Sequence, residues 1–160
     1  MQNAVVLKTK PFNAQNWRIG IVKAQFNSDI TNAQHISAIK RAKQYKLKDE
    51  NITTLNVAGS MEIPLALQTL AKTGKYKALI ALGCVIKGET PHFDYVCRLM
   101  TDGILKVQLK YDIPIGFGVL TCNNLSEAQA RTKLAGDHLD AAMQLAREIS
   151  EVNIKPDRLT

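Results

Sequence analysis

The residues best suited to chemistry follow directly after an apolar run, Ala78–Ile86. Gly88 would let the backbone approach a ligand closely, and the amides of Glu89 and Thr90 would stand near the start of a helix, where the helix dipole favours an anion. His92 comes next, and a helix N-terminus disfavours the charged imidazolium, so this side chain should be mostly neutral and able to transfer protons. The pattern predicts an anion site beside a proton-transfer group. The alternative is that Thr90 only caps the helix and His92 only packs.

Strand and helix signals alternate along the chain. Four short stretches are typical of strands: Arg18–Phe26, Ile52–Val57, Ala78–Ile86 and Ile113–Thr121. Four regions are typical of helices: Ile30–Tyr45, Glu62–Gly74, about Phe93–Tyr111, and Ser126 to about Ser150, the last of which can divide at Gly136. Such alternation requires parallel strands joined by right-handed crossovers. The sequence therefore predicts one domain over residues 1–160, a flavodoxin-like three-layer α/β/α sandwich with a four-stranded parallel sheet.

Two further details of this organisation can be predicted. Ser126 and Gln129 have the spacing of a capping box at the start of the last helical region. Residues 1–16 have no clear partner within the domain, so we expect an N-terminal arm that packs on a neighbouring subunit.

The composition limits the class of protein. Hydrophobic residues make up 46% and charged residues 22% of the chain, which is ordinary for a soluble globular protein. No apolar run approaches the ~18 residues of a membrane span, and the N-terminus has no apolar core of signal-peptide length. We therefore expect a cytoplasmic protein with no membrane partner.

The cysteines, histidines and net charge argue against several kinds of site. The three cysteines are odd in number and contain no Cys-x-x-Cys pair, and the three histidines have no metal-ligand spacing. This pattern favours a reducing compartment over a disulfide framework or a metal site. The formal net charge of +7 indicates acidic partners only weakly. The basic stretch Lys40–Lys48 has no interleaved aromatic residues, so a solvated helix face is favoured over a nucleic-acid patch.

Ligands of an open parallel sheet bind beyond the carboxyl ends of its strands, where several more candidates lie. Phe26 could stack on a planar ring or pack in the core. Glu62 could serve a ligand or only complement a helix dipole. The ring of Phe117, between two glycines, could project or pack, and Arg131 would ordinarily be a solvent-exposed side chain. The signatures of phosphate loops, zinc proteases, serine hydrolases and dinucleotide-binding folds are absent from the sequence.

A more specific signal comes from four segments that occur in the order of the predicted strands: FN, AGSMEIPLA, ALGCVIKGETPHFDYV and PIGFGVLT. Together they resemble the 6,7-dimethyl-8-ribityllumazine synthase family, and the resemblance covers about Arg18 to Ile149. It implies the condensation of 5-amino-6-(D-ribitylamino)uracil with 3,4-dihydroxy-2-butanone 4-phosphate, the penultimate step of riboflavin biosynthesis. The family needs no metal or redox cofactor for this reaction.

The resemblance also implies which residues bind the pyrimidine substrate. Phe26 would stack on its ring. The turn after the second strand would hold the ribityl chain through Ser60, Met61 and Glu62. The end of the third strand would meet the uracil edge, largely through backbone groups of Cys84, Val85 and Ile86.

For the second substrate, the resemblance places the phosphate at Glu89 and Thr90 and makes His92 the proton-transfer residue. Phe117 and Arg131 would come from the adjacent subunit, with Arg131 binding the phosphate. Active sites would then be shared between subunits of a homo-oligomer. The family forms pentamers, some stacked as decamers and some closed into sixty-subunit shells. The absence of a long insertion between the last two helical segments favours a shell.

Two departures from the family pattern concern charge near the substrates. Many members have a lysine shortly after the arginine, where this chain reads LAGDHLDAA (Leu134–Ala142), and His138 could replace that lysine in part. Glu89 places a carboxylate beside the phosphate site, and its side chain should point away. Two other functions stay open: a paralogue that binds flavin or lumazine without catalysis, and a flavodoxin-like signalling or RNA-binding domain.

Overall fold

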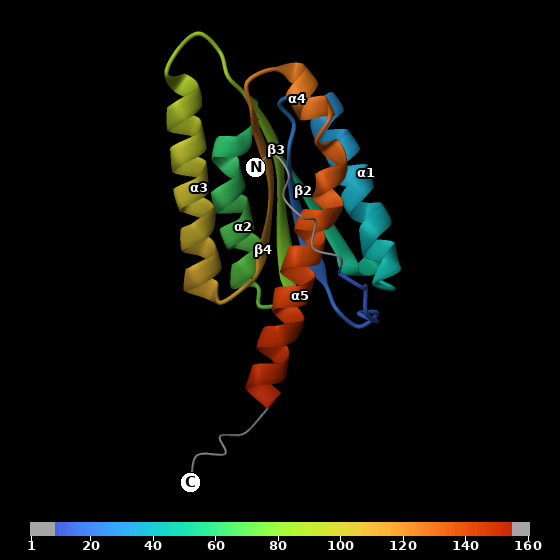
Figure 1. Ribbon diagram of the computed structural model, residues 1–160. Coiled ribbons are helices and arrows are strands. Elements are labelled where there is room, and N and C mark those ends of the chain that lie inside the picture. The colour runs from blue at the N-terminus through green and yellow to red at the C-terminus, as the bar shows by residue number, and fades with distance from the viewer. Residues whose placement is uncertain (1–8, 155–160) are drawn as a thin grey trace.

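A computed structural model describes residues 9–154 and centres on a sheet of four parallel strands in the order β2-β1-β3-β4. The strands are β1 at Ile19–Ala24, β2 at Ile52–Val57, β3 at Ala78–Ile86 and β4 at Ile115–Cys122 (Figure 1). β3 is apolar throughout because helices cover both faces of the sheet, and all but its last two residues are buried. The predicted parallel sheet is confirmed, and the predicted strands differ from the observed ones only at their ends.

The helices form the two outer layers. α1 (Ser28–Gln44) and α5 (Ala135–Ile154) cover one face of the sheet, and α2 (Ile63–Lys72) and α3 (His92–Tyr111) cover the other (Figure 1). The three-layer sandwich is therefore confirmed. The last helical region divides earlier than Gly136, since a short helix, α4 at Leu125–Gln129, is followed by a 3-10 turn before α5 begins.

The start of α4 corrects the predicted cap. Asn124, rather than Ser126, accepts a hydrogen bond from the third amide of the helix, Glu127 N, at 2.9 Å. The Glu127 carboxylate accepts from the amide of Asn123 at 2.9 Å. The predicted pair of Ser126 and Gln129 is wrong because the same polar spacing occurs two residues earlier, where asparagine is an equally good cap.

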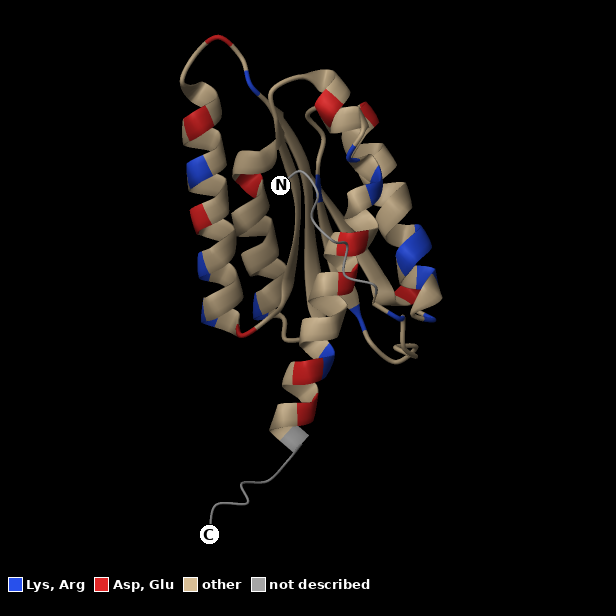
Figure 2. Ribbon diagram, in the orientation of Figure 1, with Lys and Arg blue, Asp and Glu red and all other residues tan. Residues whose placement is uncertain are grey.

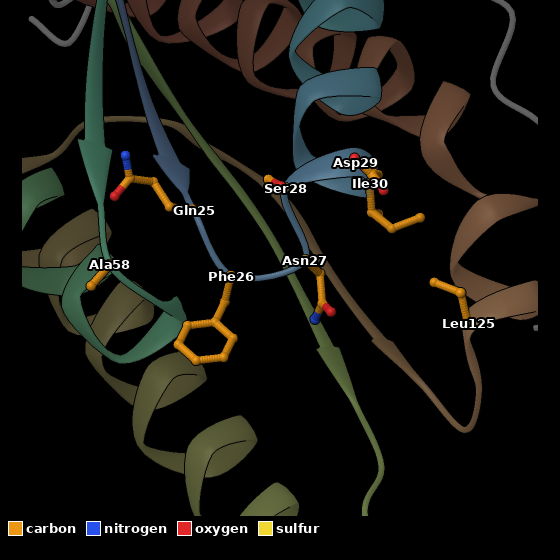
Figure 3. Close-up of a pocket in the computed structure, with 8 residues that line it drawn as sticks. All are labelled: Gln25, Phe26, Asn27, Ser28, Asp29, Ile30, Ala58 and Leu125. Carbon is orange, nitrogen blue, oxygen red and sulfur yellow. The ribbon is translucent and has the colours of Figure 1, made fainter.

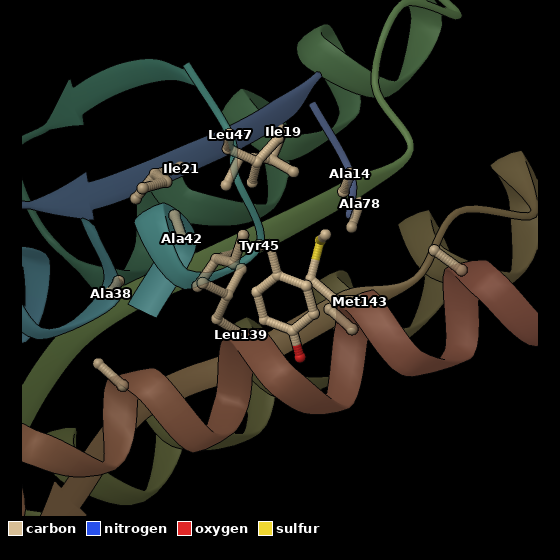
Figure 4. Close-up of a cluster of buried hydrophobic side chains, with 14 of the residues drawn as sticks. Ala14, Ile19, Ile21, Ala38, Ala42, Tyr45, Leu47, Ala78, Leu139 and Met143 are labelled. Atoms are coloured by element: carbon tan, nitrogen blue, oxygen red, sulfur yellow. The ribbon is translucent and has the colours of Figure 1, made fainter. Parts of the chain in front are cut away.

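Tyr45 lies in the hydrophobic core between the sheet and the α1–α5 layer, and its hydroxyl is a buried polar group (Figure 4). The ring of Tyr45 is fully buried, and its hydroxyl donates to the carboxylate of Asp140 at 2.7 Å. Arg41 donates two further hydrogen bonds to that carboxylate, from Nε and Nη2, at 2.7 Å each. One residue of the basic stretch Lys40–Lys48 is therefore held in an ion pair between α1 and α5 instead of on a solvated face.

Stability should depend on the ionisation of Tyr45. Burial, and then the hydrogen bond to Asp140, raises the pKa of Tyr45 to about 12 from the usual 10.0. The raised pKa favours folding fully below about pH 10, and this contribution is lost as the pH rises through 12. The free energy of unfolding, measured with urea, should fall between about pH 10 and pH 12. In the Tyr45→Phe protein it should fall less steeply with pH. An identical slope in the variant would contradict the assignment.

Residues 9–16, part of the predicted N-terminal arm, contact their own chain. The amide of Ala14 donates to the carbonyl of Tyr45 at 2.8 Å. The Phe12 ring packs edge-on against the rings of Trp17 and Tyr45, and the guanidinium of Arg147 lies over it, 5.1 Å from its centroid. Residues 1–8 lie outside the described part of the chain, so packing of this arm on a neighbouring subunit stays a prediction.

Lysine, arginine, aspartate and glutamate residues lie along the helices and in the loops (Figure 2). Lys43, for example, is exposed near the end of α1 and forms an ion pair with Asp49. Within residues 9–154, no helix combines the length and the apolar character needed to cross a membrane.

The contact between β4 and α5 allows no side chain at Gly116. A Cβ atom there would lie 2.4 Å from the backbone oxygen of His138, and a helix backbone cannot give way as a side chain can. Gly116→Ala should therefore destabilise the fold by about 1–3 kcal/mol in urea unfolding. The matched control is Gly136→Ala, where the nearest atom would be 3.5 Å away, and this change should leave stability equal or higher. Equal stability of the Gly116→Ala protein would show that α5 shifts freely.

Candidate active site

The carboxyl ends of β1, β2 and β3 surround one hollow of about 470 Å³ on the α2–α3 side of the sheet. Its walls come from the turns after β1 and β2, the end of β3 and the first turns of α3: Phe26, Asn27, Ala58, Gly59, Ser60, Met61, Glu62, Cys84, Val85, Ile86, His92 and Val96. Eight residues that the sequence predicted for the site are therefore brought together: Phe26, Ser60, Met61, Glu62, Cys84, Val85, Ile86 and His92. The hollow combines an aromatic ring, a polar turn, a strand edge and an imidazole.

The turn after β2 is held in place by its own hydrogen bonds and by β3. The Glu62 carboxylate accepts from the Gly59 amide at 2.8 Å, which fixes the short 3-10 turn of residues 60–62. Ser60 is buried against β3, and a Cβ atom at Gly83 would lie 2.9 Å from its hydroxyl oxygen. The glycine in β3 therefore makes room for this turn, and a chain of hydroxyl groups could bind along it.

Phe26 is not a core residue. Its side chain is 74% exposed at the end of β1, next to Gly59, where a Cβ atom would lie 3.7 Å from the ring. A second, more open hollow of about 650 Å³ lies along the same corner, lined also by Ser28, Asp29 and Leu125 (Figure 3). The exposure of the ring leaves it free to stack on a planar ligand, the first of the two predicted alternatives.

The loop between β3 and α3 exposes Glu89 and Thr90 to solvent, and neither lines the hollow. The Thr90 hydroxyl accepts a long hydrogen bond, 3.4 Å, from the amide of His92, the first residue of α3. The N-cap position of α3 is Pro91, and no side chain caps the helix there, so the capping interpretation of Thr90 is not confirmed. His92 itself is exposed and lines the hollow, so the packing interpretation does not describe it.

Two predicted residues, Phe117 and Arg131, do not reach the hollow of their own chain. Phe117 projects from the edge strand β4 and is 37% exposed. Arg131 is exposed after α4, where its Nη1 donates to the carbonyl of Glu127 at 2.8 Å. Neither side chain therefore contributes to the hollow that its own chain forms.

His138 and the cysteines do not supply charge or a nucleophile to the hollow. His138 lies at the start of α5, against Gly116 and Gly118 on the opposite face of the sheet, and burial lowers its pKa. It therefore does not replace a lysine within its own chain's hollow. Burial, followed by the neighbouring Cys122, raises the pKa of the Cys84 thiol to about 11, so this thiol is a poor nucleophile near neutral pH.

Four lining residues were not predicted as site residues, Asn27, Ala58, Gly59 and Val96, and of these Asn27 makes a polar contact across the site. Its amide nitrogen donates to the carbonyl oxygen of Cys84 at 2.9 Å, and so connects the end of β1 to the end of β3. The signal for it in the sequence is its position directly after Phe26, at the carboxyl end of a strand, but no spacing rule identifies such a long-range contact.

Comparisons with known proteins show the family of the chain. The family model of 6,7-dimethyl-8-ribityllumazine synthase matches residues 16–152. A 6,7-dimethyl-8-ribityllumazine synthase of Phocaeicola vulgatus is 42% identical over 119 residues, covering 74% of this chain and 71% of the relative. A 6,7-dimethyl-8-ribityllumazine synthase of Desulfovibrio desulfuricans is 37% identical over 139 residues, covering 86% of this chain and 89% of the relative. The chain therefore belongs to the 6,7-dimethyl-8-ribityllumazine synthase family.

Proposed function

We propose that the hollow at the carboxyl ends of β1, β2 and β3 is where this chain condenses 5-amino-6-(D-ribitylamino)uracil with 3,4-dihydroxy-2-butanone 4-phosphate. Family membership makes the chain an enzyme of riboflavin biosynthesis, a transferase that forms 6,7-dimethyl-8-ribityllumazine. The observation that carries the proposal is the meeting of an exposed aromatic ring, a strand edge and an imidazole around one hollow.

In this proposal, the pyrimidine lies on the exposed ring of Phe26. The uracil edge has N–H and C=O groups in one plane, and these match the backbone groups at the end of β3, from Cys84 to Ile86. The ribityl hydroxyls follow the turn of Ser60, Met61 and Glu62. The Glu62 carboxylate has one oxygen bonded to the Gly59 amide, and its other oxygen can accept from a hydroxyl.

The phosphate substrate lies at the loop before α3 in this proposal. The backbone amides of Glu89 and Thr90 and the positive end of a 20-residue helix favour a dianion there. The aryl amine attacks the ketone and a first water leaves to give an imine, phosphate is then eliminated, and the ribityl-bearing nitrogen closes the ring on the remaining carbonyl with loss of a second water. His92 moves protons in these steps, because it lines the hollow where both substrates would meet. Holding the two substrates in register supplies most of the rate enhancement.

We also propose a cytoplasmic homo-oligomer built on pentamers, in which an adjacent subunit completes each site. Phe117 and Arg131 are exposed and do not line the hollow of their own chain, which suits a contribution to a neighbour. Large apolar side chains are exposed along α3, where a second copy would bury them: Tyr95, Leu99, Leu105 and Leu109.

The test is to mix both substrates with the purified protein, follow lumazine formation by its fluorescence, and measure the mass of the assembly. Turnover by a pentamer or a multiple of it is expected. Binding of lumazine without turnover would favour the non-catalytic paralogue, and a monomer with full activity would contradict the shared site. Elution that is unaffected by nuclease and salt would argue against an RNA-binding domain.

A further inference from the structure

In the part of the chain that the structure describes, the end of β3 has no strand partner on its β1 side. β1 pairs with β3 from Ile19 opposite Ala78 to Lys23 opposite Leu82, and it then turns away. β3 continues to Ile86, and among the described strands only β4 accompanies it there. Backbone groups of a strand need partners, so a strand edge that opens onto a cavity must be satisfied by side chains, water or a ligand.

Asn27 supplies the first of these missing partners. Its Nδ2 group donates to the carbonyl oxygen of Cys84 at 2.9 Å, two residues beyond the last pair of β1 and β3. An asparagine just before a helix usually caps it, as Asn124 does for α4, but the Asn27 side chain forms no such bond to α1. The side chain is instead committed to β3.

The backbone of Asn27 turns the chain at this corner. Its φ of 54° and ψ of 49° are left-handed, a conformation that asparagine adopts more readily than most residues. The turn directly follows Phe26, whose amide donates to the carbonyl of Ala58 at 3.0 Å. Figure 3 shows the side chains of Phe26 and Asn27 leaving the corner in different directions, with the asparagine amide directed toward β3.

We propose that Asn27 is a positioning residue for the planar nitrogen heterocycle bound in the hollow. By holding the Cys84 carbonyl it fixes the β3 edge, so that the next backbone groups on this open side, those of Ile86, remain for the N–H and C=O edge of the heterocycle. By its left-handed turn it fixes the ring of Phe26 on which the heterocycle stacks. This inference rests on the proposed function. It adds Asn27 as a residue that acts on the ligand through Cys84 and Phe26.

Two variants separate the side chain from the backbone. Asn27→Gly keeps the left-handed turn and removes the amide, whereas Asn27→Asp keeps the size but turns an acceptor toward the Cys84 carbonyl. The matched control is Lys46→Gly, at another left-handed position, φ 63°, whose exposed side chain is remote from the hollow. Four quantities are measured for each full-length protein: kcat, the KM of both substrates, the midpoint temperature of thermal unfolding, and the Kd of 6,7-dimethyl-8-ribityllumazine by fluorescence titration.

Both variants should weaken lumazine binding and raise the KM of the pyrimidine substrate by about 10-fold, since a lost hydrogen bond of about 1.4 kcal/mol corresponds to that factor. The KM of the phosphate substrate and the thermal midpoint of Asn27→Gly should stay close to the parent values, and Lys46→Gly should match the parent throughout.

The inference is overturned if both variants bind lumazine as the parent does, or if both KM values and the thermal midpoint change together, as a merely structural role would produce. If the parent itself neither forms nor binds lumazine, the proposed function fails, and the role of Asn27 fails with it. If the parent forms lumazine and both Asn27 variants have the lumazine Kd and pyrimidine KM of the parent, only the role of Asn27 is overturned.

Discussion

Replacement of His92 by alanine should lower kcat by about 100-fold or more, the usual contribution of a positioned proton-transfer group. His92 is the only imidazole among the residues that line the hollow. It is the first residue of α3, and it is exposed. The measurement is single-turnover formation of lumazine at saturating substrates, together with the mass of the assembly, which should not change.

A second histidine serves as the matched control for this prediction. His35 lies on α1, hydrogen-bonded to the hydroxyl of Thr54, and does not line the hollow. His35→Gln should leave kcat within about twofold of the parent, because the chemistry does not involve it. Equal rates for His92→Ala and the parent would remove His92 from the mechanism.

Arg131→Ala should raise the KM of the phosphate substrate by about 10- to 100-fold, which corresponds to the loss of a charge-assisted hydrogen bond of about 1.5–3 kcal/mol. The KM of the pyrimidine substrate should change little. Within residues 9–154 the Arg131 guanidinium forms only one hydrogen bond, an exposed one to the backbone carbonyl of Glu127, so folding should be unaffected. Lys133→Ala, which removes a positive charge two residues away, is the control for a general loss of charge. An equal rise in the KM of the phosphate substrate in the Arg131→Ala and Lys133→Ala proteins would show that Arg131 acts only through the net charge.

Mixing the two impaired proteins tests whether Arg131 acts in a neighbouring site. In a mixed oligomer of His92→Ala and Arg131→Ala subunits, some interfaces pair an intact His92 with an intact Arg131 from the adjacent chain. Co-refolded or co-expressed mixtures should therefore regain part of the parent activity at low phosphate-substrate concentration. No recovery would place both residues in the site of a single chain.

Most of the fold could be predicted because its signals are local or periodic. The run Ala78–Ile86 is apolar at every position, which is typical of a strand buried on both faces, and β3 has these limits. Local signals failed where two possible capping residues lie close together in the sequence. At the start of α4, Asn124 caps the helix instead of Ser126. Local signals also failed at Arg41, because its partner Asp140 lies 99 residues away and no spacing rule connects them.

The site could be predicted only in part. The family motifs identified the turn residues and strand ends, since these are contiguous in sequence, and the structure places most of them around one hollow. The exposure of Phe26 could not be predicted, because a strand-end aromatic fits the core equally well. The contact of Asn27 with Cys84 was missed, since it depends on where β1 turns away from β3. The roles of Phe117 and Arg131 depend on a second chain and stay predictions.

A crystal structure of the assembled protein with 6,7-dimethyl-8-ribityllumazine and inorganic phosphate tests the central proposal most directly. We expect the lumazine ring on the face of Phe26, and the phosphate at the amides of Glu89 and Thr90 with Arg131 of an adjacent subunit beside it. The His92 imidazole should lie between the two ligands. Lumazine bound elsewhere, or a hollow filled by side chains of a neighbouring subunit with His92 turned outward, would contradict the account.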